Sequence, residues 1–163
     1  MTIIVDFGDS IKGACQLEGY KDKLQVDSFQ WGAGIGISAA GAANTTRTVS
    51  TPSISEVTLS RSSDKATPQL LKMLTKPVAS PIGKVIISFT RNDAVAQNAK
   101  YMEFTLEDVF ISGLSVSSGG DTPSESLSLN FSKITVDYFV QGLEGTADGK
   151  ESFISDAAKN VTT

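Results

Sequence analysis

Histidine is absent from this 163-residue chain, and cysteine occurs once, as Cys15. Without histidine the chain lacks the usual general base for a serine or cysteine nucleophile and the commonest ligand of zinc. A Ser-His-Asp triad and a structural zinc site are therefore excluded, and a single cysteine excludes an intramolecular disulfide. We expect no metal and no other cofactor.

Long apolar runs and basic clusters are also missing. No stretch approaches the ~20 apolar residues that a membrane helix needs, and residues 1–7 lack the basic region of a signal peptide. The net charge of −4 disfavours nucleic acid, because phosphate binding depends on clustered Lys and Arg. We therefore expect a cytoplasmic protein that neither inserts into membranes nor binds nucleic acid.

The remaining composition, 40% hydrophobic and 20% charged, is typical of a folded chain whose length suits a single domain over 1–163. Charge is unevenly divided, with a net +3 in residues 1–102 and −7 in residues 103–163. Such asymmetry could give copies of the chain unlike surfaces for head-to-tail association. Solvated charges with no grouping in space explain it as well.

Strand-like alternation is what the chain has in abundance. A Thr67-Pro68 start with leucines on one face predicts one short helix over 67–76, in which Thr67 is the N-cap. Runs rich in Val, Ile, Phe, Thr and Tyr predict β-strands at 2–7, 24–31, 54–61, 84–90, 101–116, 126–140 and 152–155.

Three of these runs change the parity of their apolar residues part-way. In the run 101–116, Leu106 and the apolar residues before it share one parity, and Val109 takes the other. Such a switch means either a bulge or a strand that is apolar on opposite faces at its two ends, and the second reading needs a partner outside the subunit. We favour the second, which predicts a subunit interface at Val109, Ile111, Ile134 and Val136.

Residues 32–52 are small and carry one charge, Arg47. Structureless loops longer than about 12–15 residues are uncommon in compact domains and are usually functional or disordered. This segment is interpreted as an arm that contacts another molecule, with a mobile surface loop as the alternative. Its candidate contact residues are Gly34, Ile35, Ile37, Ala39, Ala42, Asn44, Thr45, Arg47 and Val49.

No pattern points to catalysis. Glu107 and Asp108 adjoin, but neighbours on a strand face opposite sides and cannot share a substrate. The glycines at 32, 34 and 36 lack the following helix that a phosphate-binding loop needs. We expect that the protein is not an enzyme.

The motifs, taken in order over nearly the whole chain, resemble the haemolysin-coregulated protein family, which forms the tube of the bacterial type VI secretion system. The residues that carry the resemblance are VDSFQWG at 26–32, SDKATPQL at 63–70, LEDVFIS at 106–112, GGD at 119–121 and ESLSLNFSKI at 125–134, with Tyr138. The chain departs from the family at 13–16, where GACQ replaces a Gly-Glu-Ser start that is usually followed by a histidine.

The resemblance implies a mainly β fold: a β-barrel of two packed antiparallel sheets with one short flanking α-helix. It also implies a homohexamer whose rings stack into the inner tube, with a contractile sheath, a spike and small effectors as partners, and export by the machine without a signal peptide. The arm at 32–52 would reach the adjacent ring. For the effector-binding lumen wall we choose one polar parity, Ser126, Ser128 and Asn130. The alternative is a related contractile-injection or tail-tube barrel module that binds a ligand or effector as a monomer.

Overall fold

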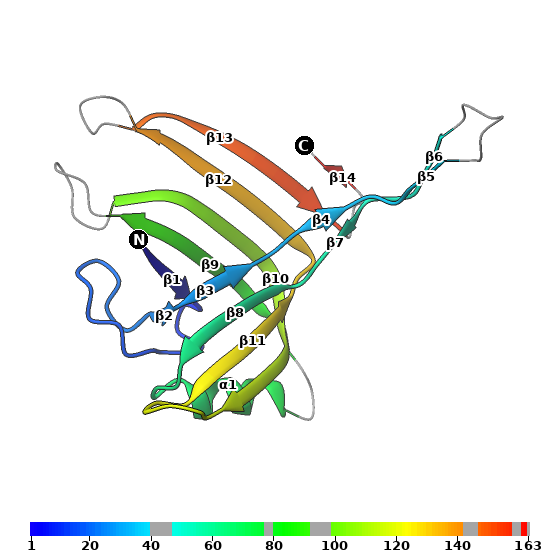
Figure 1. The fold of residues 1–163 in the computed structure, drawn as a ribbon. Coiled ribbons are helices and arrows are strands. Elements are labelled where there is room, and N and C mark those ends of the chain that lie inside the picture. Colours follow the sequence, from blue (N-terminus) through cyan, green and yellow to red (C-terminus); the bar gives the residue numbers. More distant parts are fainter. Residues whose placement is uncertain (40–46, 77–79, 92–98, 142–146, 158–160, 163) are drawn as a thin grey trace.

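A computed structural model describes residues 1–39, 47–76, 80–91, 99–141, 147–157 and 161–162 (Figure 1). Within these ranges the chain is mainly β, with one short helix, as the sequence predicts. The strands are β1 (Thr2–Asp6), β2 (Leu24–Val26), β3 (Ser28–Gln30), β4 (Ala33–Gly34), β5 (Ile37–Ala39), β6 (Arg47–Val49), β7 (Ser53–Ile54), β8 (Val57–Ser62), β9 (Ile82–Arg91), β10 (Ala99–Ser117), β11 (Ser124–Asn130), β12 (Lys133–Gln141), β13 (Ala147–Asp156) and β14 (Val161–Thr162). The helix is α1 (Thr67–Leu74).

The centre of the fold is a long, bent hairpin in which β10 runs antiparallel to β11 and then to β12. Phe110 pairs with Asn130 in β11 and Glu107 pairs with Lys133 in β12, so the register is the same on both sides of the bend. Strand β10 thereby belongs to two walls (Figure 1). The upper wall has the order β2-β1-β9-β10-β12-β13-β14, and the lower wall has the order β10-β11-β8-β3.

At each position where the apolar residues of the sequence change parity, the chain bends from one wall to the other; we call these bends corners. Asp108, at the corner of β10, has a φ of +52°, in the left-handed region that only a few residue types adopt readily. Leu106 and Val109, on either side of this corner, both have 0% exposure and point into the same core. The chain also changes walls at Asp27, between β2 and β3, and at 131–132, between β11 and β12.

The corners overturn the reasoning behind the predicted subunit interface. Val109, Ile111 and Ile134 are 0%, 9% and 0% exposed, so a neighbouring subunit has almost no surface of these side chains left to cover. Val136 is half-buried. The bend turns the new parity inward after each switch, so the outward-facing reading was wrong. The register does not shift across Asp108, so the switch there comes from the corner itself and not from a bulge.

The predicted barrel is only partly found. Strands β4 with β7 and β5 with β6 form two separate two-stranded sheets. The other ten described strands form one continuous sheet folded over at its corners, and the path of pairing does not close. Its ends β2 and β3 are joined through Asp27, whose amide donates to the carbonyl oxygen of Ser60 in β8 at 2.8 Å. The two walls therefore face each other across a core as branches of one sheet, not as a closed barrel.

Both walls contribute apolar side chains to this core. Val57 and Leu127 of the lower wall and Ile87 of the upper wall have 0% exposure. Aromatic rings fill the space under β3, where Phe29 lies 5.2 Å from Phe89, measured between ring centroids. Full burial of such side chains contributes about 1.5–3 kcal/mol each, which makes this core the main source of stability.

Helix α1 covers one end of the lower wall (Figure 1). Leu70 is its fully buried contact, and the amide of Thr75 closes its last turn on the carbonyl oxygen of Leu71 at 3.0 Å. The predicted capping role of Thr67 is wrong, since Ala66 occupies the N-cap position and the Thr67 hydroxyl donates to Glu125 of β11 instead.

Candidate functional site

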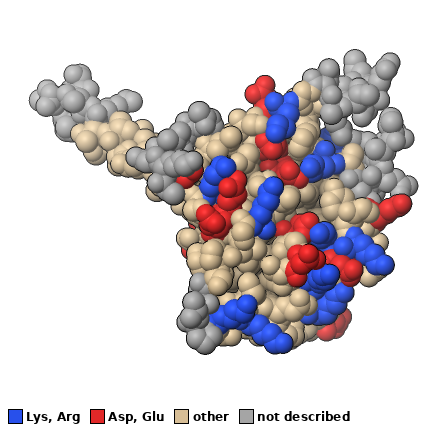
Figure 2. Space-filling view, turned by 180° about the vertical axis from the view of Figure 1, so that it is seen from behind, with Lys and Arg blue, Asp and Glu red and all other residues tan. Residues whose placement is uncertain are grey.

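The arm is a narrow two-stranded ribbon that projects from the body (Figures 1 and 2). Strand β4 pairs with β7, and further out β5 pairs with β6, with Ile37 opposite Val49. Of the predicted contact residues, Gly34, Ile35, Ile37, Ala39, Arg47 and Val49 belong to this ribbon, while Ala42, Asn44 and Thr45 lie outside the described residues. Whether the ribbon contacts another subunit stays a prediction.

Serine hydroxyls hold the ribbon together. The amide of Gly36 donates to Ser50 Oγ at 2.8 Å, and the amide of Gly32 donates to Ser55 Oγ at 2.9 Å. A Cβ at position 36 would lie 2.7 Å from Ser50 Oγ, so a larger residue there would displace the hydroxyl from this hydrogen bond. The ribbon thus satisfies its own polar groups without using its large apolar side chains.

Those apolar side chains are exposed instead. Ile35, Ile37 and Val49 are 46%, 61% and 56% exposed, and Ile54 at the base is 36% exposed. Ile37 and Val49 stand opposite each other and share one face of the ribbon, as do Ala33 and Ile54 nearer the body. An exposed apolar ribbon face of this kind is typical of a contact surface.

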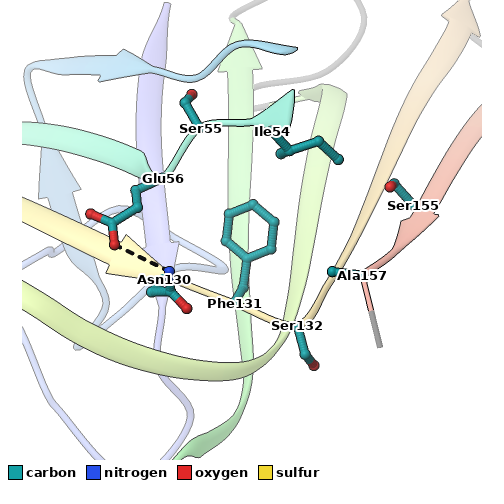
Figure 3. A pocket seen from close by; sticks show the side chains of 8 residues that line it. All are labelled: Ile54, Ser55, Glu56, Asn130, Phe131, Ser132, Ser155 and Ala157. Carbon is teal, nitrogen blue, oxygen red and sulfur yellow. Dashed lines mark hydrogen bonds between the residues drawn. The ribbon is translucent and has the colours of Figure 1, made fainter. Parts of the chain in front are cut away.

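A hollow of about 230 Å³ lies at the base of the arm (Figure 3). The Glu56 carboxylate is fixed beside it by two donors, Asn130 Nδ2 at 3.1 Å and Ser112 Oγ at 2.9 Å. The hollow is lined by Ile54, Ser55, Glu56, Asn130, Phe131, Ser132, Ser155 and Ala157. It therefore joins one predicted lumen residue, Asn130, to the foot of the arm.

The predicted lumen residues lie on the outer face of the lower wall. Leu127 and Leu129 of β11 point into the core, so Ser126, Ser128 and Asn130 point away from it. Ser126 stands between Ser60 of β8 and Ser115 of β10. By the same registers, the described residues that face outward from β3, β8, β11 and the second half of β10 are all uncharged. That this face lines a lumen remains a prediction.

An exposed apolar strip that the sequence analysis did not select lies at the far end of β12. Tyr138 and Val140 share the inward parity of Ile134, yet they are 46% and 43% exposed, because β12 extends past the lower wall that covers Ile134. The signal was present in the alternation of 134, 136, 138 and 140. Parity alone does not show where the covering wall ends.

A buried polar cluster was also missed. Arg61 is 1% exposed and forms ion pairs with Asp64 and with Glu125, the latter at 3.7 Å. Asp64 in turn accepts from the amides of Ala66 at 2.7 Å and Ala14 at 3.0 Å. The cluster joins β8, β11, the start of α1 and the loop between β1 and β2. The available signal was Arg61 itself, a charged residue on the inward parity of Val57 and Leu59.

The environment of Asp64 shifts its pKa. Burial raises the pKa of this carboxyl, but hydrogen bonds from Arg61 and from the amides of Ala66 and Ala14, together with the Arg61 charge, outweigh burial. The net result is a pKa below the ordinary value, so the ionised form of Asp64 favours the folded chain.

Charges of both signs alternate on the face of the molecule seen in Figure 2. Lys133 pairs with Glu107 at 2.8 Å and Lys150 with Asp137 at 3.2 Å on the upper wall. On this face, the charge division along the sequence does not become a division in space. Among the described residues there is no group of three or more His, Cys, Asp or Glu placed to hold a metal ion, and no helix there is long and apolar enough to cross a membrane.

Comparison with known proteins decides the family. A family model described as type VI secretion system effector, Hcp, matches residues 4–138. The chain belongs to the Hcp family. Protein hcp1 of Pseudomonas aeruginosa is 30% identical over 98 residues, a match that spans 59% of this chain and 59% of that protein. The resemblance found in the sequence is thereby confirmed.

Solved structures show that the Hcp fold covers the whole chain. One, named as a type six secretion system protein, superposes with a TM-score of 0.80 at 16% identity and covers 99% of both chains. Hcp1 from Salmonella typhimurium superposes with a TM-score of 0.74 at 20% identity, covering 99% of this chain and 98% of that one. At such identities the likeness is one of fold.

Proposed function

We propose that this Hcp-family protein is the structural subunit of a type VI secretion inner tube. It forms homohexameric rings that stack, and the lumen of the stack carries small effectors. The observation that carries this proposal is the lower wall, a four-stranded sheet with an uncharged, hydroxyl-rich outer face and an open edge on each side.

The open edges supply a means of closing a ring. Phe110–Ser117 of β10 pair with β11 on one edge, and among the described strands nothing pairs with their other edge. At the opposite side of this wall, β3 pairs only with β8. An unpaired strand edge can pair with a strand of another chain. In a ring of copies placed edge to edge, both edges of the lower wall would be paired. The serine-rich face would then form the lumen wall.

The apolar strip on β12 supports lateral packing. Tyr138 and Val140 lie on the inner face of the upper wall, beyond the part that the lower wall covers. A neighbouring subunit would bury them, and they replace Val109, Ile111 and Ile134 as the side chains whose exposure should fall on assembly.

The sheath, the spike and small effectors are the proposed partners, and the protein is made in the cytoplasm and exported by the machine.

Purified protein tests this function directly. Light scattering should give the mass of six chains, and negative-stain microscopy should show rings with a central hole. A monomer at high concentration would overturn the proposal and favour the alternative of a monomeric ligand-binding module.

The lumen assignment has its own test. In a Cys15→Ala background, Ser126→Cys should react with a small maleimide but slowly with a polyethylene glycol maleimide in the assembled ring. Ser80→Cys, on an exposed segment before β9, is the matched control and should react quickly with both. Equal rates at the two positions would remove Ser126 from the lumen.

A further inference from the structure

Glu56 continues the outer face of the lower wall beyond the start of β8. It directly precedes this strand and shares the parity of Thr58 and Ser60, so it points to the same side as the serines of β11. The two donors that fix its carboxylate, Ser112 and Asn130, come from β10 and β11 on that face. Glu56 therefore places a negative charge at the edge of a face whose strand residues are uncharged.

The charge of Glu56 has no cation to balance it within the described part of the chain. Both of its hydrogen-bond donors, an amide and a hydroxyl, are neutral. The ion pairs found among the described residues use other carboxylates. A carboxylate accepts several hydrogen bonds, so Glu56 can accept from a further donor. A positively charged donor is favoured, because charge-assisted hydrogen bonds are the stronger ones.

An aromatic ring stands beside this carboxylate. Phe131 follows β11 at the corner, is half-buried, and stands between Glu56 and Ile54 in the view of Figure 3. Among the described residues, the contacts between rings and between cations and rings join other side chains and do not include Phe131. The face of an aromatic ring attracts an ammonium or guanidinium group within about 6 Å of its centre. Glu56 and Phe131 thus favour the same kind of group.

The hollow that these residues line has room for one long side chain. Its volume of about 230 Å³ is below the roughly 300–1,000 Å³ of sites for drug-sized ligands. Ile54 and Ala157 add apolar lining, which suits the methylene stem that a lysine or arginine side chain buries behind its charged end. Size, charge and ring together match a basic side chain.

We propose that Glu56, Phe131 and Ile54 form a binding site for a lysine or arginine side chain of the cargo in the lumen. The cation pairs with the Glu56 carboxylate and lies on the Phe131 ring, and its stem lies along Ile54. This inference rests on the proposed tube function and names the chemistry by which the lumen recognises its cargo. Acidic side chains would be repelled by the same carboxylate, so the site selects between cargoes by charge.

Repetition around the ring makes a weak contact useful. One exposed ion pair contributes little on its own. A ring of copies repeats the site in every subunit, so a cargo with several basic side chains is held by several contacts at once. Because exposed charges are screened by salt, high ionic strength should release such a cargo.

Isoleucine methyl signals in NMR spectra test the site in the assembled protein. The probe is N-acetyl-lysine methylamide, and N-acetyl-norleucine methylamide is its counterpart without the amine. The lysine probe should shift the signal of Ile54 to saturation and leave that of Ile37 unchanged, because Ile37 lies further out on the arm and does not line this hollow. The norleucine probe should shift neither signal at the same concentrations.

Substitutions identify the groups that bind the probe. Glu56→Gln should raise the concentration of lysine probe that gives half of the full shift at least fivefold, and Phe131→Leu, which lacks the ring, should raise it at least twofold. Glu18→Gln, which removes an exposed carboxylate from the loop between β1 and β2, is the matched control and should change nothing. Equal shifts with the two probes, or an undiminished response in Glu56→Gln, would overturn the proposal.

Light scattering on the same samples separates this result from the tube function. Rings in which the Ile54 signal does not respond would reject the site alone. A responding monomer would reject the tube, and with it a cargo in the lumen, but would keep the site for a basic side chain. A response that is present in dissociated subunits and lost in rings would show that a neighbouring copy fills the hollow, which overturns the cargo assignment.

Discussion

At the scale of single residues, the ion pairs of Arg61 join the ends of β8, β11 and α1. Its guanidinium is fully buried between Asp64 and Glu125, and Thr67 donates to the other oxygen of Glu125. Buried charges are tolerated only when they are paired, because each loses its hydration. The cluster therefore holds these elements together, and removing its cation leaves two carboxylates without their positively charged partner.

Arg61→Met should lower the free energy of unfolding by about 3–5 kcal/mol, the range typical of a buried ion pair broken on one side. Urea denaturation measures this change. Lys12→Met, which removes an exposed pair with Asp9 at 3.6 Å, is the control and should change stability by less than about 0.5 kcal/mol. An equal effect of the two substitutions would show that the cluster contributes nothing.

Asp64 adds a dependence on pH. Its folded pKa lies below its ordinary value of 3.8, so its contribution to stability is complete above that value and is lost as pH falls through the folded pKa. In Asp64→Asn, the free energy of unfolding should fall less steeply than in the native chain as the pH drops below about 4. If the free energy of unfolding fell equally steeply with pH in the native chain and in Asp64→Asn, this role of Asp64 would be contradicted.

At the scale of elements, the corners explain what the sequence could and could not reveal. The period of two in 101–116 and 126–140 correctly located both strands and the residues at which their parity changes. It could not choose between a bend and an outward face, because that choice depends on which wall lies opposite. The long hairpin was therefore predictable, and the burial of Val109 and Ile134 was not.

The corner at Asp108 should tolerate residues that adopt positive φ and reject branched ones. Asp108→Gly should leave stability within about 1 kcal/mol, since glycine gains freedom at φ +52° but loses the 3.0 Å hydrogen bond from Ser132 Oγ. Asp108→Val should cost at least about 1–2 kcal/mol more, because a branched Cβ crowds the backbone there. Thermal unfolding of the pair would show the difference, and a valine variant as stable as the glycine one would reject the corner.

At the scale of the whole molecule, the arm and the lower wall show how far a single chain can predict an assembly. The small and nearly uncharged residues of 32–52 were enough to single out this segment, because so long a connection without a clear strand pattern is uncommon in a compact domain. The open edges of β10 and β3 were not predictable, since an edge is defined by the strands that do not pair with it. Tyr138 escaped selection for the same reason: its exposure depends on where another element ends.

Tyr138→Ser with Val140→Ser should weaken lateral association while leaving the subunit folded, because both side chains are already 46% and 43% exposed. Light scattering on dilution should show dissociation at a concentration at least tenfold higher than for the native protein. Thr135→Ser, a half-buried position of opposite parity on the same strand, is the control and should not change the mass. Unchanged association of the double variant would remove this strip from the subunit interface.

Strand β10 also has a mechanical consequence. Over 19 residues it is paired with β9 and β12 on one side of its corner and with β11 on the other. A load along its axis is opposed by all three ladders in shear, since their hydrogen bonds lie across the direction of pull. A subunit driven along this strand should hold its shape under a thrust that would peel apart a sheet loaded from its edge.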